Sequence, residues 1–178
     1  MKHKEALLIA SELVGRFSIF CERIQIAGSL RREKPDVGDI EIVAAPQMVS
    51  DLFGGKVPVT NGVDWGQYGR VNKSGPRYCQ IALPEGINLD LFLVYPPAQW
   101  GVIFALRTGP AEFSKWLVTR RNQRGALPSD CQVKDGVVWR RGEPIPMPEE
   151  EDFFKFIGLP ILPPVQRSDF DVKKVVYR

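Results

Sequence analysis

Apolar residues at the start of the chain recur with the spacing of one helix face. Ala6, Ile9, Ala10, Leu13 and Phe17 follow helical spacing, which predicts an amphipathic helix over residues 4–17. Further along, the pattern predicts strands over residues 23–27, 39–45, 77–83 and 87–95, with a hairpin turn at 84–86. A short helix is predicted over residues 30–33, with Ser29 as its cap, and another over residues 47–53. The composition of residues 56–76 predicts short strands and an exposed loop.

A pair of prolines, Pro96-Pro97, interrupts this pattern and predicts a domain boundary between residues 1–96 and 97–178. Beyond it, the pattern predicts helices over residues 100–106, 111–124 and 149–157, and a hairpin over 131–140. Phe113, Trp116 and Leu117 are the expected buried stripe of the 111–124 helix. The composition of residues 159–178 predicts a Pro-containing coil, and a short strand within this segment is the alternative.

The composition is that of an ordinary soluble globular protein. Of 178 residues, 44% are hydrophobic and 25% are charged. Cys21, Cys79 and Cys131 are far apart, which disfavours a zinc site or a disulfide framework and favours a reducing cytoplasm. No apolar run reaches the roughly 18 residues of a membrane span, and acids interrupt the N-terminal apolar run, so we expect no signal peptide. The sole histidine, His3, nearly excludes histidine-based catalysis, and a net charge of +3 is too mild to establish nucleic-acid binding.

Acidic residues stand inside two of the apolar strands. Asp39 and Glu41 project on one face of the predicted 39–45 strand, and Asp90 lies between leucines in NLDLFLV. If the two strands pair, three carboxylates converge on one patch, and like charges that close need a counter-charge. Neither strand contains a basic residue, so the pattern favours a divalent metal, and all-oxygen ligation favours Mg²⁺ or Mn²⁺. An exposed strand face is the alternative interpretation.

A Gly-Ser pair precedes the acidic strand. Gly28 allows close backbone approach, and Ser29 with the amides that follow predicts a phosphate-binding nest. Arg31 and Arg32 add cations for phosphate oxygens. A lone Gly-Ser pair is usually a turn, but its combination with the acids indicates phosphoryl or nucleotidyl transfer by two metals.

The pattern of Gly28-Ser29, Asp39-x-Glu41 and Asp90 resembles the nucleotidyltransferase superfamily. More closely, five segments of the chain resemble, in order, the palm and thumb of family X DNA polymerases. These segments are GSLRR, VGDIEIV, LDLFLV, WGVIFALRTGPAEFSKWL and GEPIPMPEEEDFFKFIGLPILPP. The resemblance implies an α+β fold: a palm in residues 1–96, with a mixed β-sheet and helices packed on one face, then a small α/β thumb in residues 97–178. It also implies the minimal palm-plus-thumb form without the N-terminal lyase and fingers domain, as in very small viral polymerases of this family.

The resemblance implies roles for matching positions. Asp39 and Glu41 would bind two Mg²⁺ ions, for which Mn²⁺ would substitute, and Asp90 would bind the catalytic ion and help to activate the primer 3′-hydroxyl. The implied nucleotide-binding residues are Gly28, Ser29, Arg32, Gly38, Leu106, Arg107, Thr108, Gly109 and Ser114. The implied DNA-binding residues are Lys115, Arg120, Arg121 and Arg124. The implied activity is template-directed DNA synthesis from dNTPs by a monomer, on primer-template or gapped duplex, in gap filling or repair.

Three positions depart from the family pattern. Glu41 stands where family X polymerases usually have Asp, although the wider superfamily accepts Glu. Leu106-Arg107 replaces the usual aromatic pair before Thr-Gly, which predicts weaker exclusion of ribonucleotides. Ser114 replaces an amide side chain that commonly contacts the base, which predicts low base-pair fidelity.

Basic residues of the second domain favour a nucleic-acid partner. Arg120 and Arg124, one turn apart in the predicted 111–124 helix, would follow a duplex backbone or form an ordinary solvated face. The loop residues Trp65, Tyr68 and Arg70 have two interpretations, stacking on exposed bases or packing in a small core. Two alternatives to the polymerase remain: a nucleotidyltransferase that modifies RNA or another acceptor, and a non-catalytic or impaired DNA-binding relative.

Overall fold

The chain folds as two units, Met1–Tyr95 and Pro96–Arg178, in a computed structural model that describes residues 1–171. The break falls one residue before the predicted boundary. Within the segment 159–178, Pro164–Ser168 form a 3₁₀ turn. Residues 172–178, where the alternative strand could still lie, are outside the described residues. No helix within residues 1–171 has both the length and the apolar character that a membrane crossing requires.

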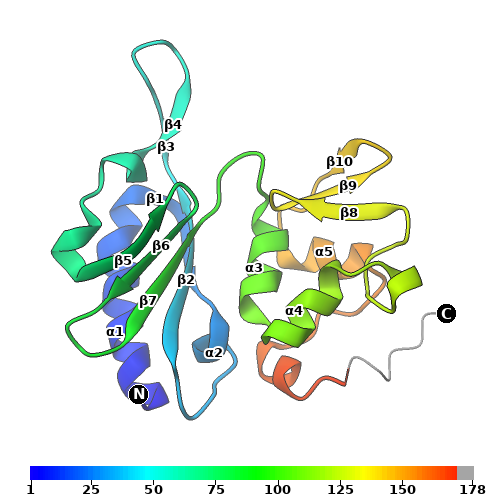
Figure 1. The fold of residues 1–178 in the computed structure, drawn as a ribbon, viewed down its shortest axis with the longest axis horizontal. Helices are drawn as coiled ribbons and strands as arrows, with labels where there is room; N and C mark the ends of the chain where they lie inside the picture. The colour runs from blue at the N-terminus through cyan, green and yellow to red at the C-terminus, as the bar shows by residue number, and fades with distance from the viewer. Residues whose placement is uncertain (172–178) are drawn as a thin grey trace. The chain divides into compact units, whose positions relative to one another are not determined.

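A five-stranded mixed sheet forms the centre of the first unit (Figure 1). In spatial order its strands are β1 (Cys21–Ile26), β2 (Asp39–Pro46), β7 (Asn88–Leu93), β6 (Tyr78–Ala82) and β5 (Arg70–Gly75). β2 and β7 are parallel, and the other neighbouring strands are antiparallel. The four predicted strands are therefore confirmed. Gly86 supplies the positive φ of 79° that the turn between β6 and β7 needs.

The helix α1 (His3–Phe17) covers one face of this sheet, behind the strands as drawn in Figure 1. The alternate strand residues Ile40, Ile42, Leu89 and Leu91 are almost fully buried in the same cluster as the apolar face of α1. Each such side chain contributes about 1.5–3 kcal/mol when it is fully buried. Because side chains alternate along a strand, the acids of β2 and β7 project from the opposite face.

Two aromatic residues of the predicted loop join this core. The Trp65 and Tyr68 rings meet the Phe17 ring edge-on, with centroid distances of 5.4 Å and 4.9 Å. Such edge-to-face contacts stabilise by about 0.5–1.5 kcal/mol beyond the area that they bury. The core-packing alternative therefore describes these two side chains in this structure.

The helix predicted over residues 47–53 is wrong. These residues belong to a hairpin of β3 (Met48–Ser50) and β4 (Lys56–Pro58). The Asp51 carboxylate accepts hydrogen bonds from the backbone N–H groups of Phe53, at 2.9 Å, and Gly55, at 2.7 Å. Gly54 adopts a φ of 80° in the same turn. An Asp side chain that binds its own turn, together with two glycines, favours a hairpin over a short helix.

Within residues 96–171, the second unit combines three α-helices with a small antiparallel sheet (Figure 1). Its helices are α3 (Trp100–Thr108), α4 (Ala111–Val118) and α5 (Glu150–Phe156), and its strands are β8 (Cys131–Lys134), β9 (Val137–Arg140) and β10 (Glu143–Ile145). The hairpin predicted over residues 131–140 is confirmed, with its turn at Asp135-Gly136, while β10 was not predicted. Phe113, Trp116 and Leu117 are buried, as expected.

The predicted 111–124 helix ends earlier, at Val118. Thr119 is extended, Arg121–Gln123 form a 3₁₀ turn, and Arg124 has a left-handed φ of 64°. Backbone hydrogen bonds join Leu127 N–H to the Thr119 carbonyl at 2.9 Å, and Arg121 N–H to the Leu127 carbonyl at 2.7 Å. These bonds to a returning chain replace the helical ones, so Arg120 and Arg124 are not one helical turn apart.

A buried ion pair attaches the 3₁₀ turn Pro164–Ser168 to α5. The Arg167 guanidinium donates to the Glu150 carboxylate at 2.6 Å, and the two side chains are 0% and 5% exposed. Two further nitrogens of Arg167 donate to the Leu162 carbonyl at 2.9 Å and 2.8 Å, and the guanidinium lies 4.9 Å from the centre of the Phe154 ring. The charge is therefore compensated on several sides.

Glu150→Ala is expected to lower the free energy of unfolding by about 3–5 kcal/mol, because it leaves a buried guanidinium without its carboxylate. Urea unfolding followed by tryptophan fluorescence measures the loss. Glu12→Ala is the matched control, since it removes a pair with Arg16 whose side chains are 58% (Arg16) and 63% (Glu12) exposed. Equal effects of the two substitutions would contradict a stabilising role for the buried pair.

Candidate active site

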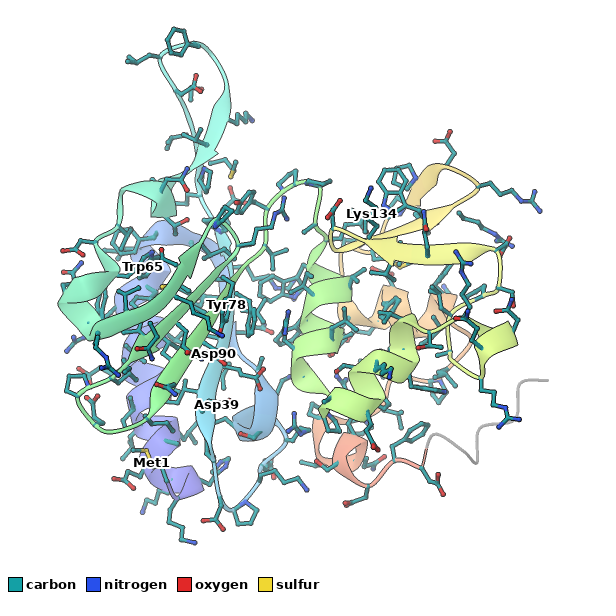
Figure 2. All side chains as sticks on the ribbon, viewed as in Figure 1. Met1, Asp39, Trp65, Tyr78, Asp90 and Lys134 are labelled. Atoms are coloured by element: carbon teal, nitrogen blue, oxygen red, sulfur yellow. The ribbon has the colours of Figure 1, made fainter. Side chains whose placement is uncertain are left out.

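The parallel pairing of β2 with β7 brings the acidic residues together on the sheet face opposite α1. Glu41 is the direct partner of Asp90, and Asp39 that of Asn88. Figure 2 labels Asp39 and Asp90, which lie near each other on these two strands. The condition stated from the sequence, that the two acidic strands pair, is therefore met.

Asp39 is half-buried, and its carboxyl group responds to its neighbours. Burial, followed by the negative charge of Asp90, raises the pKa of Asp39 above its ordinary value of 3.8. The positive charge of Arg32 and the backbone N–H of Asp39 itself act in the opposite direction. The upward effects are larger, so negative charge at this position is incompletely compensated by the protein.

Asp90 is held by two side chains from β6 that the sequence patterns did not single out. The Tyr78 hydroxyl donates to Asp90 Oδ1 at 2.8 Å, and the Gln80 amide donates to the same oxygen at 2.9 Å. The signal was present in the predicted hairpin, since a turn at 84–86 sets Gln80 opposite Asp90 and polar residues alternate along the 77–83 strand.

Glu41 is directed elsewhere. Gly28 comes directly after β1, the strand that flanks β2 on the side away from β7. A Cβ atom built at Gly28 would overlap the Glu41 carboxylate. Within residues 1–171, no three His, Cys, Asp or Glu side chains are gathered closely enough to hold a metal ion. The expected convergence of three carboxylates is therefore incomplete: the three residues share a face, but the longer Glu41 side chain lies against Gly28.

The Gly-Ser loop lies directly beside the acidic strand. The backbone N–H of Ala27 donates to the Glu41 carbonyl at 2.8 Å, which attaches the loop to β2. The short helix α2 (Gly28–Arg31) begins after Ala27, so Ser29 lies inside it and is not its cap, contrary to the prediction. The Ser29 hydroxyl is buried and has no hydrogen-bond partner among the described residues. Gly38, also predicted as a nucleotide contact, is exposed and has open space around it.

The predicted nucleotide-binding residues of the second unit meet at the corner between α3 and α4. The Ser114 hydroxyl donates to the Leu106 carbonyl at 2.6 Å. Thr108 is fully buried, and a Cβ at Gly109 would overlap the Phe113 ring and the Ser114 hydroxyl. Ser114 therefore closes the corner in this structure, and Arg107 is exposed on α3.

The predicted DNA-binding cations divide into two pairs. Arg120 Nε donates to the Cys131 carbonyl at 2.9 Å, and Arg121 donates to the carbonyls of Ala126, at 3.2 Å, and Ile157, at 2.6 Å. These two side chains hold the loop that follows α4. Lys115 and Arg124 are exposed and line a surface pocket of about 310 Å³ together with Glu112, Trp116, Thr119 and Gln123.

Comparison with known families finds a match in the second unit. Residues 104–168 match the family model described as DNA polymerase beta thumb. The matched segment begins within α3 and includes α4, α5 and the sheet between them. A search of curated proteins returned no significant match. The family match supports a DNA polymerase-related, DNA-binding role at the level of this unit.

Gly28→Ala is expected to lower the free energy of unfolding by about 1–3 kcal/mol. Gly28 has a φ of 60°, which strains any side chain, and the added methyl group would displace the Glu41 carboxylate. Gly38→Ala is the matched control, because nothing lies within 4 Å of its Cβ position. Urea unfolding of the two variants checks the difference, and equal stability would contradict the contact between Gly28 and Glu41.

Asp39→Asn is expected to stabilise the metal-free protein at neutral pH. A carboxyl group with a raised pKa contributes stability that is full below its ordinary pKa of 3.8 and is lost as the pH rises through the raised pKa. The neutral amide avoids that loss, so its advantage appears above this pH and vanishes below it. Urea unfolding midpoints across a pH series measure the effect.

Asp36→Asn is the control with the opposite sign. A hydrogen bond from Lys2 and its positive charge lower the pKa of Asp36, so its contribution to stability is present at neutral pH and is lost on acidification. An Asp39→Asn variant that is less stable than the wild type at neutral pH would show that the Asp39 charge is better compensated than the structure indicates.

Proposed function

We propose that this protein is a template-directed DNA polymerase of the family X type, which adds dNTPs to a primer 3′-hydroxyl in gap filling or repair. The observation that carries the proposal is the pairing of β2 with β7, which sets Asp39, Glu41 and Asp90 on one face beside the Gly-Ser loop. The family match of residues 104–168 supplies the DNA-binding context. In this proposal the first unit is the palm and the second is the thumb.

The donor groups on this face suit a hard divalent cation. Asp39 and Asp90 offer carboxylate oxygens, the ligands that Mg²⁺ and Mn²⁺ prefer. The raised pKa of Asp39 comes first from burial and then from the negative charge of Asp90, and a bound cation would offset both effects. Glu41 would join them by turning its side chain away from Gly28. When bound, two such ions would polarise the phosphate and stabilise the charge that develops during nucleotidyl transfer.

The residues of the chain would then act on the two reactants. Asp90 would orient the primer 3′-hydroxyl and help to remove its proton, because a carboxylate oxygen is a hydrogen-bond acceptor. The buried Ser29 hydroxyl lacks a protein partner and would donate to a phosphate oxygen of the incoming nucleotide. Arg32, whose positive charge already acts on Asp39, would balance the triphosphate beside it.

In the second unit, Lys115 and Arg124 are the better candidates for phosphate contacts. Both are exposed beside one surface pocket. Arg120 is exposed as well, but its Nε donates to a backbone carbonyl, and the half-buried Arg121 donates to two. Contacts of this kind would position a duplex without reading its sequence. The proposed partners are therefore primer-template or gapped DNA and a dNTP.

One observation favours a second candidate, an impaired DNA-binding relative of these polymerases. Glu41 is directed toward Gly28, and no group of three potential ligands is assembled within residues 1–171. If Glu41 cannot leave Gly28, the acidic face would lack a ligand that two-metal chemistry uses. DNA binding without nucleotide addition would be the expected behaviour of such a protein.

Primer extension on gapped and recessed DNA tests the proposal. The wild type is expected to add dNTPs with Mg²⁺ or Mn²⁺, and Asp39→Ala or Asp90→Ala is expected to lower the rate by about a thousandfold, because each removes several kcal/mol of transition-state stabilisation. Asp36→Ala is the control, since it removes an exposed acid that pairs with Lys2. Its rate should equal that of the wild type.

Two outcomes would contradict the polymerase. No addition to any DNA under either metal, with DNA binding retained, would support the impaired relative. Addition to RNA or to another acceptor, with none to DNA, would support a different nucleotidyltransferase.

A further inference from the structure

Three side chains on neighbouring strands form a closed hydrogen-bonded triangle around one oxygen atom. Tyr78 and Gln80 on β6 both donate to Asp90 Oδ1, and the Gln80 amide also donates to the Tyr78 hydroxyl at 3.2 Å. The register explains the arrangement, because Gln80 is the direct partner of Asp90 and Tyr78 that of Phe92. Figure 2 labels Tyr78 beside Asp90.

The donors and acceptors of the triangle agree without conflict. The single hydroxyl proton of Tyr78 goes to Asp90, which leaves an oxygen lone pair to accept from Gln80. The two amide protons of Gln80 serve the carboxylate and the hydroxyl. The reversed amide would direct its oxygen at the carboxylate, so this network assigns the amide orientation.

The triangle is also held from outside. The Tyr78 ring stacks on the Phe92 ring, with centroids 5.1 Å apart and planes 26° apart. Phe92 is 8% exposed, and Tyr78 and Gln80 are both half-buried. An Asp side chain on a strand would otherwise turn among several rotamers. Two charge-assisted hydrogen bonds to Oδ1 select one of them and occupy that oxygen.

We propose that Tyr78 and Gln80 are positioning residues that fix the Asp90 carboxylate and present Oδ2 to the reacting centre. This inference rests on the proposed function, in which Asp90 binds the metal and orients the primer hydroxyl. The two acids therefore differ. The orientation of the Asp90 carboxylate is already fixed by its neighbours, whereas the Glu41 side chain must turn away from Gly28 to bind a metal ion. Neither Tyr78 nor Gln80 touches the substrate in this proposal.

Two variants remove the hydrogen bonds with little change of shape. Tyr78→Phe keeps the ring and its stacking on Phe92, and Gln80→Met keeps the side-chain length but cannot donate. Matched controls lie in the same unit, where Tyr95 donates its hydroxyl to the Pro76 carbonyl at 2.8 Å and Gln67 donates its amide to the Asp64 carbonyl at 2.9 Å. Tyr95→Phe and Gln67→Met remove one such bond each, away from Asp90.

The first measurement is Mn²⁺ binding to the metal-free protein by titration calorimetry. Tyr78→Phe and Gln80→Met are each expected to weaken Mn²⁺ affinity by about 10-fold to 100-fold, as loss of a ligand-orienting partner does. The second is primer extension, in which kcat should fall by a similar factor while the KM for dNTP stays within about twofold. Urea unfolding midpoints should match those of the two controls.

The outcomes separate this inference from the proposed function. If wild type binds Mn²⁺ and extends primers, but Tyr78→Phe and Gln80→Met match the controls in both measurements, the positioning role is overturned and the polymerase stands. If wild type binds Mn²⁺ but adds no nucleotide, the proposed function fails, and Mn²⁺ affinity alone decides whether these residues position Asp90. A wild type that binds no Mn²⁺ overturns the positioning of a metal ligand.

Discussion

The parallel pairing of β2 with β7 is the contact on which the candidate site depends. The position of the acids depends on the register of these strands, because a slip of one residue would move every side chain of a strand to the other face of the sheet. The burial of Ile40, Ile42, Leu89 and Leu91 with α1 prevents such a slip. The apolar core therefore fixes, as a consequence of its own packing, the face from which the acids project.

Two locally unfavourable features lie on neighbouring elements of the first unit, β2 and α2. Burial and the charge of Asp90 raise the pKa of Asp39, and the buried Ser29 hydroxyl has no hydrogen-bond partner among residues 1–171. Both lower stability in the absence of a ligand. The stability of the first unit comes from elsewhere, chiefly from the core that its sheet forms with α1. Concentration of such costs in one place is typical of a functional site.

The second unit shows how tertiary contacts reassign residues of one chemical type. Lys115, Arg120, Arg121 and Arg124 follow the start of α4, and the predicted 111–124 helix would put Arg120 and Arg124 one turn apart. The chain instead turns back after Val118, and Arg120 and Arg121 donate to carbonyls of other segments. Lys115, Arg120 and Arg124 stay exposed. The turn after Val118 therefore gives Arg120 and Arg121 contacts within this unit that their chemical type alone does not predict.

The sequence by itself determined the elements whose signals are local and long: α1, the hairpin of β6 and β7, the acidic strand β2 and α5. It also indicated the candidate chemistry, because Asp39, Glu41, Asp90 and the Gly-Ser pair are unusual among apolar neighbours. Only the tertiary structure decided that Glu41 lies against Gly28, that Tyr78 and Gln80 hold Asp90, and that α4 ends at Val118. The physical reason is that these features depend on contacts between separate segments, which override the weak preference of a few residues for a helix or a rotamer.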